Sequence, residues 1–472
     1  MRAFRQLMVA GVFGIAGCAV GPDYETPEIE VQPEWLAEAE AADESALPDQ
    51  WWTLLEDQGL DTALANAANA NLEIAIAMAR VDEARAFRSV ARSAFWPQVD
   101  ANARYTEFEQ SIESPGAGGT LIEAGLIPRE VDFYTATLDA SWELDLFGAR
   151  RRQAEAANAE LESALENARA VRLAVLAETA AAYFEMRGAE ERLRIAESNV
   201  AAQERTLELT RRKVEAGLGR RIDELRAEAQ WNAVRSLMPA LRSSQTASRY
   251  RLAVLTGERP EDLPTVIAAP GNLPTAPVAV PVGMRAEILR RRPDVLAAER
   301  SLAAATAGIG VAKAEFFPRL VLSANYGFES SVASNIGDSR ARTSALVPFV
   351  SWPVFQGGRL RANLEGANAR TQAAAYAYEQ SVLVALADAE SAIVAYNEEA
   401  TTFERLDLAA DASIRAADIA TQLYEQGLTD FLTVLDAQRR RDEAVDARAQ
   451  SRTRQLLSLS RLYKALGGGW EA

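Results

Sequence analysis

Two long stretches without proline are the dominant pattern of this chain. They cover residues 148–216 and 358–425, which are 69 and 68 residues long, several times the usual length of a globular helix. In the second stretch apolar residues recur at alternating spacings of four and three, which is the period of a coiled-coil seam. Only two polar residues interrupt this stripe, which consists of Val382, Leu386, Ala389, Ile393, Tyr396, Ala400, Phe403, Asp407, Ala410, Ile414, Ala417, Thr421 and Tyr424.

A glycine follows each long stretch, and a second helical pattern follows each glycine. Gly217 precedes a pattern over about 222–255, and Gly427 precedes one over about 431–466. Glycine is the residue that most easily takes the left-handed conformation needed to end a helix. Each long stretch therefore predicts a coiled-coil hairpin with a glycine at its tip.

Shorter segments with a period of two predict strands. Apolar and polar residues alternate over 98–105, 134–143 and 320–328, while a fourth segment, 343–354, alternates poorly and contains two prolines. One apolar and one polar face is the pattern of a strand. A half-buried antiparallel sheet and a membrane barrel with its apolar face toward lipid both fit this pattern.

The chain repeats one plan twice. Three pairs of matching segments occur in the same order and are separated by 221, 210 and 210 residues: Phe95–Tyr105 with Phe316–Tyr326, Ser141 onward with Ser351 onward, and Val214–Leu218 with Tyr424–Leu428. Each repeat is predicted to begin with helices, at about 71–95 and 294–316, that end just before a proline. We expect a first repeat at 57–259, a proline-rich linker at 260–284, a second repeat at 285–466 and a tail at 467–472.

The N-terminus resembles a bacterial lipoprotein signal. Arg2 and Arg5 precede the short apolar run Leu7–Ala16, which is too brief to span a bilayer. The sequence Ile15-Ala16-Gly17-Cys18 then matches a lipobox, and Cys18 is the only cysteine. We expect residues 1–17 to be a signal peptide, Cys18 to carry a covalent lipid, and 18–56 to be an extended anchor segment. Ala19 after the cysteine favours the outer membrane.

Composition excludes several classes of function. The chain has 67 acidic and 50 basic residues, a net charge of −17, which becomes −19 without residues 1–17. Such a charge repels nucleic acid. The chain has no histidine, which removes His-based zinc sites and the Ser-His-Asp triad. We expect no enzyme activity, no metal and no cofactor other than the lipid on Cys18.

These parts together resemble a known family. The chain is similar to TolC-like outer-membrane efflux channels, in their NodT-type lipoprotein branch. The stretches that carry the resemblance are CAVGPDYETP from Cys18, SWELDLFG from Ser141, RRRPDVLAAER from Arg290, FFPRL from Phe316, FQGGRLRA from Phe355, LTVLDAQ from Leu432 and LGGGW at Leu466–Trp470.

The resemblance implies both an architecture and partners. It implies a mostly α-helical homotrimer, in which four strands per chain build a 12-stranded transmembrane β-barrel and the hairpins build an α-barrel in the periplasm. It also implies a passive conduit for small molecules, served by a periplasmic adaptor and an inner-membrane pump, usually proton-driven. A type I secretion outlet, a periplasmic scaffold without a pore and a lipid-anchored hydrolase are the alternatives.

The resemblance also implies a gate near the hairpin ends. Tyr424 would help to hold the periplasmic end shut, and Asp223 and Asp436 would ring the constriction. The arginine usual two residues after the tip glycine is replaced here by Thr429. The hairpin tips at Gly217 and Gly427 would contact the adaptor. Three copies of each acid in a narrow space would attract cations, so we expect a cation-selective channel that is closed at rest.

Overall fold

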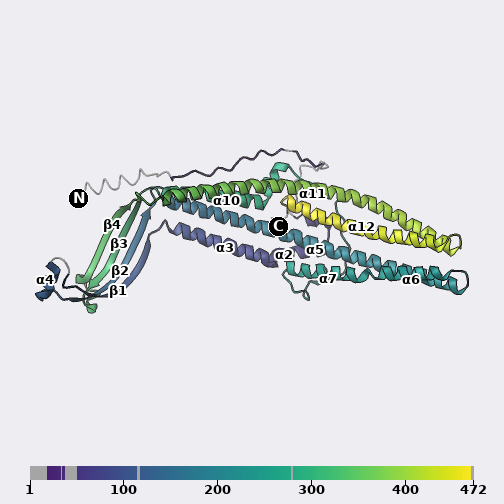
Figure 1. Cartoon of the computed structure of the whole chain (residues 1–472), viewed down its shortest axis with the longest axis horizontal. Helices are drawn as coiled ribbons and strands as arrows, with labels where there is room; N and C mark the ends of the chain where they lie inside the picture. Colours follow the sequence, from purple (N-terminus) through teal and green to yellow (C-terminus); the bar gives the residue numbers. More distant parts are fainter. Residues whose placement is uncertain (1–18, 33, 38–49, 114–116, 278–279, 469–472) are drawn as a thin grey trace. The chain divides into compact units, whose positions relative to one another are not determined.

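The structure is a computed structural model that describes residues 19–32, 34–37, 50–113, 117–277 and 280–468. Its elements are η1 (Trp51–Leu55), α2 (Gln58–Ala70), α3 (Leu72–Ser93), β1 (Gln98–Glu109), α4 (Ala117–Glu123), β2 (Glu130–Leu144), α5 (Ala149–Glu215), α6 (Arg221–Arg235), α7 (Met238–Leu255), α8 (Thr265–Ala268), η2 (Arg285–Glu287), α9 (Ile288–Arg291), α10 (Pro293–Ala314), β3 (Arg319–Ser330), η3 (Ala333–Asn335), η4 (Ser339–Ala341), β4 (Arg342–Ser351), α11 (Arg359–Glu425) and α12 (Phe431–Ala465) (Figure 1). The expected class, mostly helical with four strands, is confirmed. The predicted signal peptide and Cys18 lie outside the described residues.

The chain divides into two units. The first comprises Met1–Thr26, Asp82–Glu162 and Glu299–Tyr376, and the second comprises the remaining three segments, Pro27–Val81, Ser163–Ala298 and Ala377–Ala472. The first unit holds the strands, and the second holds the hairpin ends.

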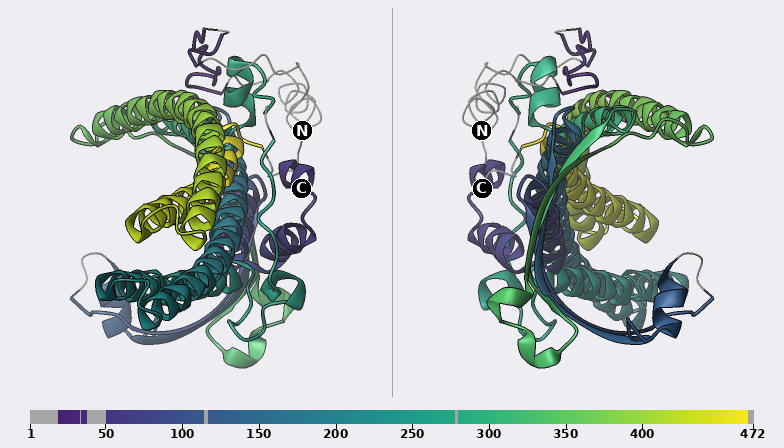
Figure 2. Two further views of the ribbon diagram at one scale, coloured as in Figure 1. Left: turned by 90° about the vertical axis from the view of Figure 1, so that its right-hand side faces the viewer. Right: turned by 90° about the vertical axis from the view of Figure 1, so that its left-hand side faces the viewer.

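The four strands of the first unit form one antiparallel sheet in the order β1-β2-β3-β4. Figures 1 and 2 show them as a single curved layer. The register brings the predicted apolar residues together, because Leu138 is opposite Ala101 on one side and Tyr326 on the other. The predicted fourth strand ends earlier than expected, at Ser351, since Pro353 cannot donate to a strand ladder.

Two tryptophans form hydrogen bonds that connect the ends of strands to the segments just after helices α3 and α10. The indole N–H of Trp142 donates to the carbonyl of Phe95 at 3.0 Å, and that of Trp352 donates to the carbonyl of Phe316 at 3.1 Å. The same contact thus occurs at corresponding places in the two predicted repeats. Every residue of β1 is exposed in the single chain. This strand therefore does not match the half-buried sheet that was one of the two alternatives.

The segment after Cys18 packs closely on the first unit. Gly21 has a φ of +109°, and a Cβ there would lie 2.5 Å from the Cα of Gly310. The guanidinium of Arg152, whose side chain is 5% exposed, donates to the carboxylate of Asp23 at 2.6 Å. Glycine at both positions of the close contact is therefore a packing requirement.

Helix α10 is long and apolar enough, by length and composition alone, to cross a membrane, and it is the one such helix among the described residues. It carries the ion pair Glu299–Arg300. Its Ala305 carbonyl also accepts a hydrogen bond from Thr371 of α11 at 3.0 Å. We interpret its apolar character as a packing property, since such a helix in a packed position is weak evidence for a membrane span.

The second unit contains two helical hairpin ends, α5 with α6 and α11 with α12 (Figures 1 and 2). All thirteen members of the predicted stripe on α11 are buried or half-buried, which confirms the coiled-coil period. The prediction of one continuous helix over 222–255 is wrong. The helix breaks at Ser236 and Leu237, because Pro239 lies in the first turn of α7 and has no N–H for a continuing helix.

Helix α2 was not predicted from the sequence. Asp57 caps its N-terminus by accepting hydrogen bonds from the backbone N–H groups of Gly59 and Leu60 at 2.9 and 3.1 Å. Its own residues Leu60 and Leu64 are buried. An aspartate before a short apolar pattern is a readable helix start, although the pattern is brief.

Part of the predicted linker, residues 267–277, contacts three long helices in turn, and we call this segment the belt. Arg187 of α5 donates to the carbonyls of Ile267 and Ala269 at 3.2 and 2.6 Å. Arg452 of α12 then donates to the carbonyl of Leu273 at 2.8 Å. Tyr396 of α11 donates to the carbonyl of Pro277 at the end of the belt.

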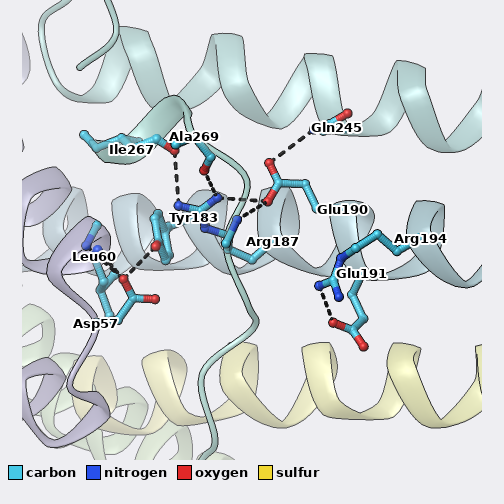
Figure 3. A network of polar contacts seen from close by, with 12 residues as sticks. Asp57, Leu60, Tyr183, Arg187, Glu190, Glu191, Arg194, Gln245, Ile267 and Ala269 are labelled. Atoms are coloured by element: carbon cyan, nitrogen blue, oxygen red, sulfur yellow. Dashed lines mark hydrogen bonds and ion pairs between the residues drawn. The ribbon is translucent and has the colours of Figure 1, made fainter. Parts of the chain in front are cut away.

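Arg187 is the centre of the polar network at this belt (Figure 3). Arg187 is only 2% exposed, and its guanidinium pairs with the carboxylate of Glu190 at 2.9 Å. Glu190 also accepts from Gln245 of α7, and Tyr183 donates to the cap residue Asp57 at 2.7 Å. Burial acts to lower the pKa of Arg187, but hydrogen bonds with Glu190 and Tyr183 outweigh it, so the pKa is raised.

The arginine run before α10 forms ion pairs and hydrogen bonds at the start of that helix. Arg292 pairs with Asp294 at 2.6 Å and with Asp388 of α11 at 3.4 Å, and Pro293 opens the helix. The guanidinium also donates to the carbonyl of Ala465 at 3.3 Å. The run is therefore a helix start tied to two other helices.

Replacing Arg187 is expected to destabilise the second unit strongly. Arg187→Met removes the ion pair and two carbonyl contacts, and leaves Glu190 buried without its cation, which costs about 3–5 kcal/mol. The measurement is urea unfolding in detergent, followed by helical circular dichroism. Arg194→Met is the control, since that arginine is 51% exposed and its pair with Glu191 should contribute less than about 1 kcal/mol. Equal destabilisation by both substitutions would contradict the central role of Arg187.

Candidate functional site

The two hairpin ends have the same backbone geometry. Gly217 and Gly427 have φ values of +72° and +76°, the left-handed conformation predicted for a tip glycine. The next residue in each case, Leu218 or Leu428, donates its N–H to a carbonyl five residues earlier at 2.8 Å. This is the Schellman arrangement. It leaves both leucine side chains in water, 82% and 69% exposed.

A small apolar core lies just before these ends. All four helices of the two hairpins contribute to it: Leu207 from α5, Ala227 from α6, Ala420 and Tyr424 from α11, and Phe431 and Val434 from α12. The rings of Tyr424 and Phe431 lie 5.7 Å apart. This core is where the second hairpin packs against the first near the tips.

Tyr424 is one of the six buried residues of this core. It is 8% exposed, and burial raises the pKa of its hydroxyl. That hydroxyl hydrogen-bonds with the side chain of Thr210 on α5. Its backbone carbonyl accepts from the ammonium of Lys213 at 2.6 Å, and this ammonium also lies 3.8 Å from the centre of the tyrosine ring.

Asp223 lies in the first turn of α6 and is 6% exposed. Its carboxylate accepts two hydrogen bonds from the guanidinium of Arg220, at 3.0 and 3.2 Å, and Arg226 lies 3.7 Å away. An acid in the first turn of a helix is also favoured by the helix dipole. The structure thus gives this predicted acid a local structural role and two partner cations.

Asp436 is the more accessible of the two predicted acids. Its side chain is 64% exposed and pairs with Arg440, one turn later on α12, at 2.9 Å. Both residues line a groove of 1020 Å³ together with Arg226 of α6 and Asp430. The groove therefore presents acids and arginines side by side, a more balanced charge than the sequence suggested.

Asp430 and Thr433 act together at the start of α12. The carboxylate of Asp430 accepts from the backbone N–H of Thr433 at 2.9 Å and from its hydroxyl at 2.8 Å. These two hydrogen bonds lower the pKa of Asp430, and the charge of Arg220 on the other hairpin lowers it further. Sequence reasoning did not assign this cap, although an aspartate three residues before a threonine at a helix start is its ordinary signal.

Lys213 is the contact residue that sequence reasoning missed. Its only local signal is its place in the last turn of α5, beside Arg212. Among the described residues, no group of three or more acidic or cysteine side chains is placed to hold a metal ion. The hairpin ends are thus a site of packing and charge contacts.

Comparison with known proteins identifies the family. A sequence model of the outer membrane efflux protein family matches residues 63–258 and 285–468, on either side of the predicted linker. The chain belongs to this family. Outer membrane efflux proteins are channels of the outer membrane and not enzymes, so the hydrolase alternative falls away.

Individual members of the family are similar over nearly the whole chain. The pyoverdine export outer membrane protein OpmQ of Pseudomonas putida is 32% identical, over 92% of this chain and 91% of its own. The solved outer-membrane channel OprN is 36% identical with a TM-score of 0.88, covering 96% of this chain and all of its own. The open state of the MtrE channel of Neisseria gonorrhoeae is 30% identical, with a TM-score of 0.85 and coverage of 96% and 99%.

These likenesses confirm the TolC-like fold and the outer-membrane location. Because these relatives are membrane channels, the amphipathic strands fit a membrane barrel better than an ordinary sheet or a scaffold without a pore. The assignments of Tyr424, Asp223 and Asp436 to a gate, and of both tip glycines to adaptor contact, stay predictions. The boundaries of the predicted repeats stay predictions as well.

The cap at Asp430 makes a pH-dependent contribution to the start of α12. Because the pKa of Asp430 lies below its ordinary value of 3.8, the stabilisation is fully present above pH 3.8 and is lost as the pH falls through the lowered pKa. Amide hydrogen exchange at Thr433 is therefore expected to accelerate in strong acid. Asp430→Ala should show fast exchange already at neutral pH, whereas Thr429→Ala in the same loop should not. Identical exchange in both variants would contradict the cap.

Proposed function

We propose that this protein is the outer-membrane channel of a three-component efflux system. It is a passive trimeric conduit that exports small molecules delivered by a proton-driven inner-membrane pump through a periplasmic adaptor. The observation that carries the proposal is the whole-chain likeness to the OprN channel at 36% identity. The pyoverdine export name of OpmQ supports a small molecule as cargo and gives no support to the type I secretion alternative.

The open sheet supports a trimer. Within the sheet, β1 and β4 are the two edge strands, and each pairs with only one neighbour. An edge with free backbone N–H and C=O groups does not persist in hydrocarbon, where each unsatisfied group costs several kcal/mol. Pairing β4 of one copy with β1 of the next satisfies both edges. Three copies then close a barrel of twelve strands.

The hairpin ends support the gate and the adaptor contact. The exposed side chains of Leu218 and Leu428 offer two apolar points on otherwise polar tips, which suits contact with another protein. The core around Tyr424 holds the two hairpins of one copy together next to these tips. A partner that binds both tips could therefore change how the two hairpins pack against each other. In this proposal the channel is closed until such a partner binds.

The groove supports weak rather than strong cation selectivity. Three copies of Asp436 in a narrow space attract cations and repel one another. Each copy is accompanied by Arg440 at 2.9 Å, which offsets part of the negative potential. The selectivity is thus set by the balance between these two side chains.

Planar-bilayer recording tests the channel and the charge balance together. The purified protein is expected to give a small conductance that favours cations. Asp436→Asn should lower the ratio of cation to anion permeability, because it removes a negative charge from the groove. Arg440→Gln should raise this ratio, because it removes the positive charge that offsets Asp436. Each change is expected to be on the order of twofold. No conductance from a protein whose mass is that of a trimer would refute the channel, and a shift of the same sign in both variants would refute the role of Asp436.

The lipid anchor at Cys18 is part of the proposal. The next residue, Ala19, packs so closely on Gly148 that a Cβ at Gly148 would lie 2.6 Å from the Cα of Ala19. A lipid on Cys18 would thus start one residue from the first turn of α5. The strands that end at this junction would enter the same membrane.

Intact-mass measurement tests this anchor. The mature protein is expected to begin at Cys18 and to carry acyl chains, whereas Cys18→Ser should lack the added mass because a hydroxyl does not replace the thiol as the acceptor. Arg152→Gln, which disturbs the segment after Cys18 but not the lipobox, should keep the added mass. An unmodified Cys18 in protein purified from membranes would exclude the anchor.

A further inference from the structure

The C-terminal end of α11 lacks a cation of its own. A helix ends with unsatisfied carbonyls and a partial negative charge, which basic residues in the last turn commonly offset. The last turn of α5 has two such residues, Arg212 and Lys213, whereas the last turn of α11 has none and ends on Glu425. Two helices of equal length thus differ in the charge at their ends.

Lys213 supplies the missing cation from the other hairpin. Its ammonium donates to the carbonyl of Tyr424 at 2.6 Å and lies 3.8 Å from the centre of that ring. The same carbonyl also accepts from the N–H of Gly427 at 3.0 Å, so its capacity is used in full. A cation over an aromatic face and a charged hydrogen bond at a helix end each add to the attraction.

The neighbours of Lys213 do not reach across in this way. Arg211 lies 3.5 Å from Glu224 on α6, within the first hairpin. Arg212 pairs with Glu208 on its own helix. The chain has only three lysines among its 50 basic residues, and a compact ammonium can approach a single carbonyl closely, whereas the planar fork of arginine favours bidentate partners.

We propose that Lys213 is a latch that joins the two hairpins at their tips by providing the charge that the end of α11 lacks. This rests on the proposed function and specifies how the gate is held. The ammonium is half-buried beside the apolar core, so solvent screens it less than an exposed pair. Separation of the hairpins leaves the end of α11 without its cation.

Three substitutions separate the latch from a general charge effect. Lys213→Met keeps an unbranched side chain that is one atom shorter and removes the charge. Lys464→Met makes the same change at an exposed lysine in the last turn of α12 and serves as the control. Glu425→Lys, added to Lys213→Met, gives α11 a cation in its own last turn without joining it to α5.

Amide hydrogen exchange over residues 423–431 is the first measurement, made on the full chain in detergent. Lys213→Met is expected to exchange about tenfold faster there than the unmodified protein, and Lys464→Met should be unchanged. The double variant Lys213→Met/Glu425→Lys should recover most of the protection, which a purely structural role for the lysine stem would not produce. Unchanged exchange in Lys213→Met, or no recovery in the double variant, would overturn the latch.

Channel recording then tests whether the latch controls the gate. Lys213→Met should raise the conductance several-fold, more than Tyr424→Phe, which loses only the contact with Thr210. The double variant should stay as open as Lys213→Met, because its new cation does not tie the hairpins together. A closed Lys213→Met channel would overturn the control of the gate. If no variant conducts at all, the proposed channel fails, while the exchange data still decide the latch.

Discussion

The structure depends on one constraint, which is that backbone hydrogen-bonding groups in a membrane must be satisfied within protein. A sheet of four strands leaves two edges open, so a single copy of this chain is incomplete in lipid. Its own helices leave all of β1 exposed. In the trimer that we propose, β4 of one copy pairs with β1 of the next, and this pairing satisfies both edges.

Where strand becomes helix, the chain passes from one kind of hydrogen bonding to another. At these junctions the indoles of Trp142 and Trp352 donate to the free carbonyls of Phe95 and Phe316. The close approach of Gly21 to Gly310 brings the segment after Cys18 to the same unit. A side chain at either glycine would push this segment away. The junction thus depends on a few polar contacts and on glycine at positions 21 and 310.

Periodicity made much of the fold predictable, because spacing is a local property of the sequence. It predicted three of the four strands and the buried stripe of α11, while the absence of proline marked both long helices. It failed where a short signal competed with a long one, since Pro239 divides what reads as one helix and α2 is too brief to stand out. The contact of Lys213 with Tyr424 joins residues 211 positions apart. No spacing rule within one helix reveals such a partner.

The contacts of the belt with Arg187 fix α5 at a point far from its C-terminal end. Arg187, which the belt holds, lies 26 residues before Lys213 on the same helix, a lever arm of about 39 Å at about 1.5 Å per residue. A tilt of about 5° at the belt therefore moves the end of α5 by about 3 Å over this length. Directed away from Tyr424, that displacement would take the 2.6 Å hydrogen bond at Lys213 well beyond hydrogen-bonding distance. A rotation of a few degrees at the belt is thus enough to break this contact between the hairpins.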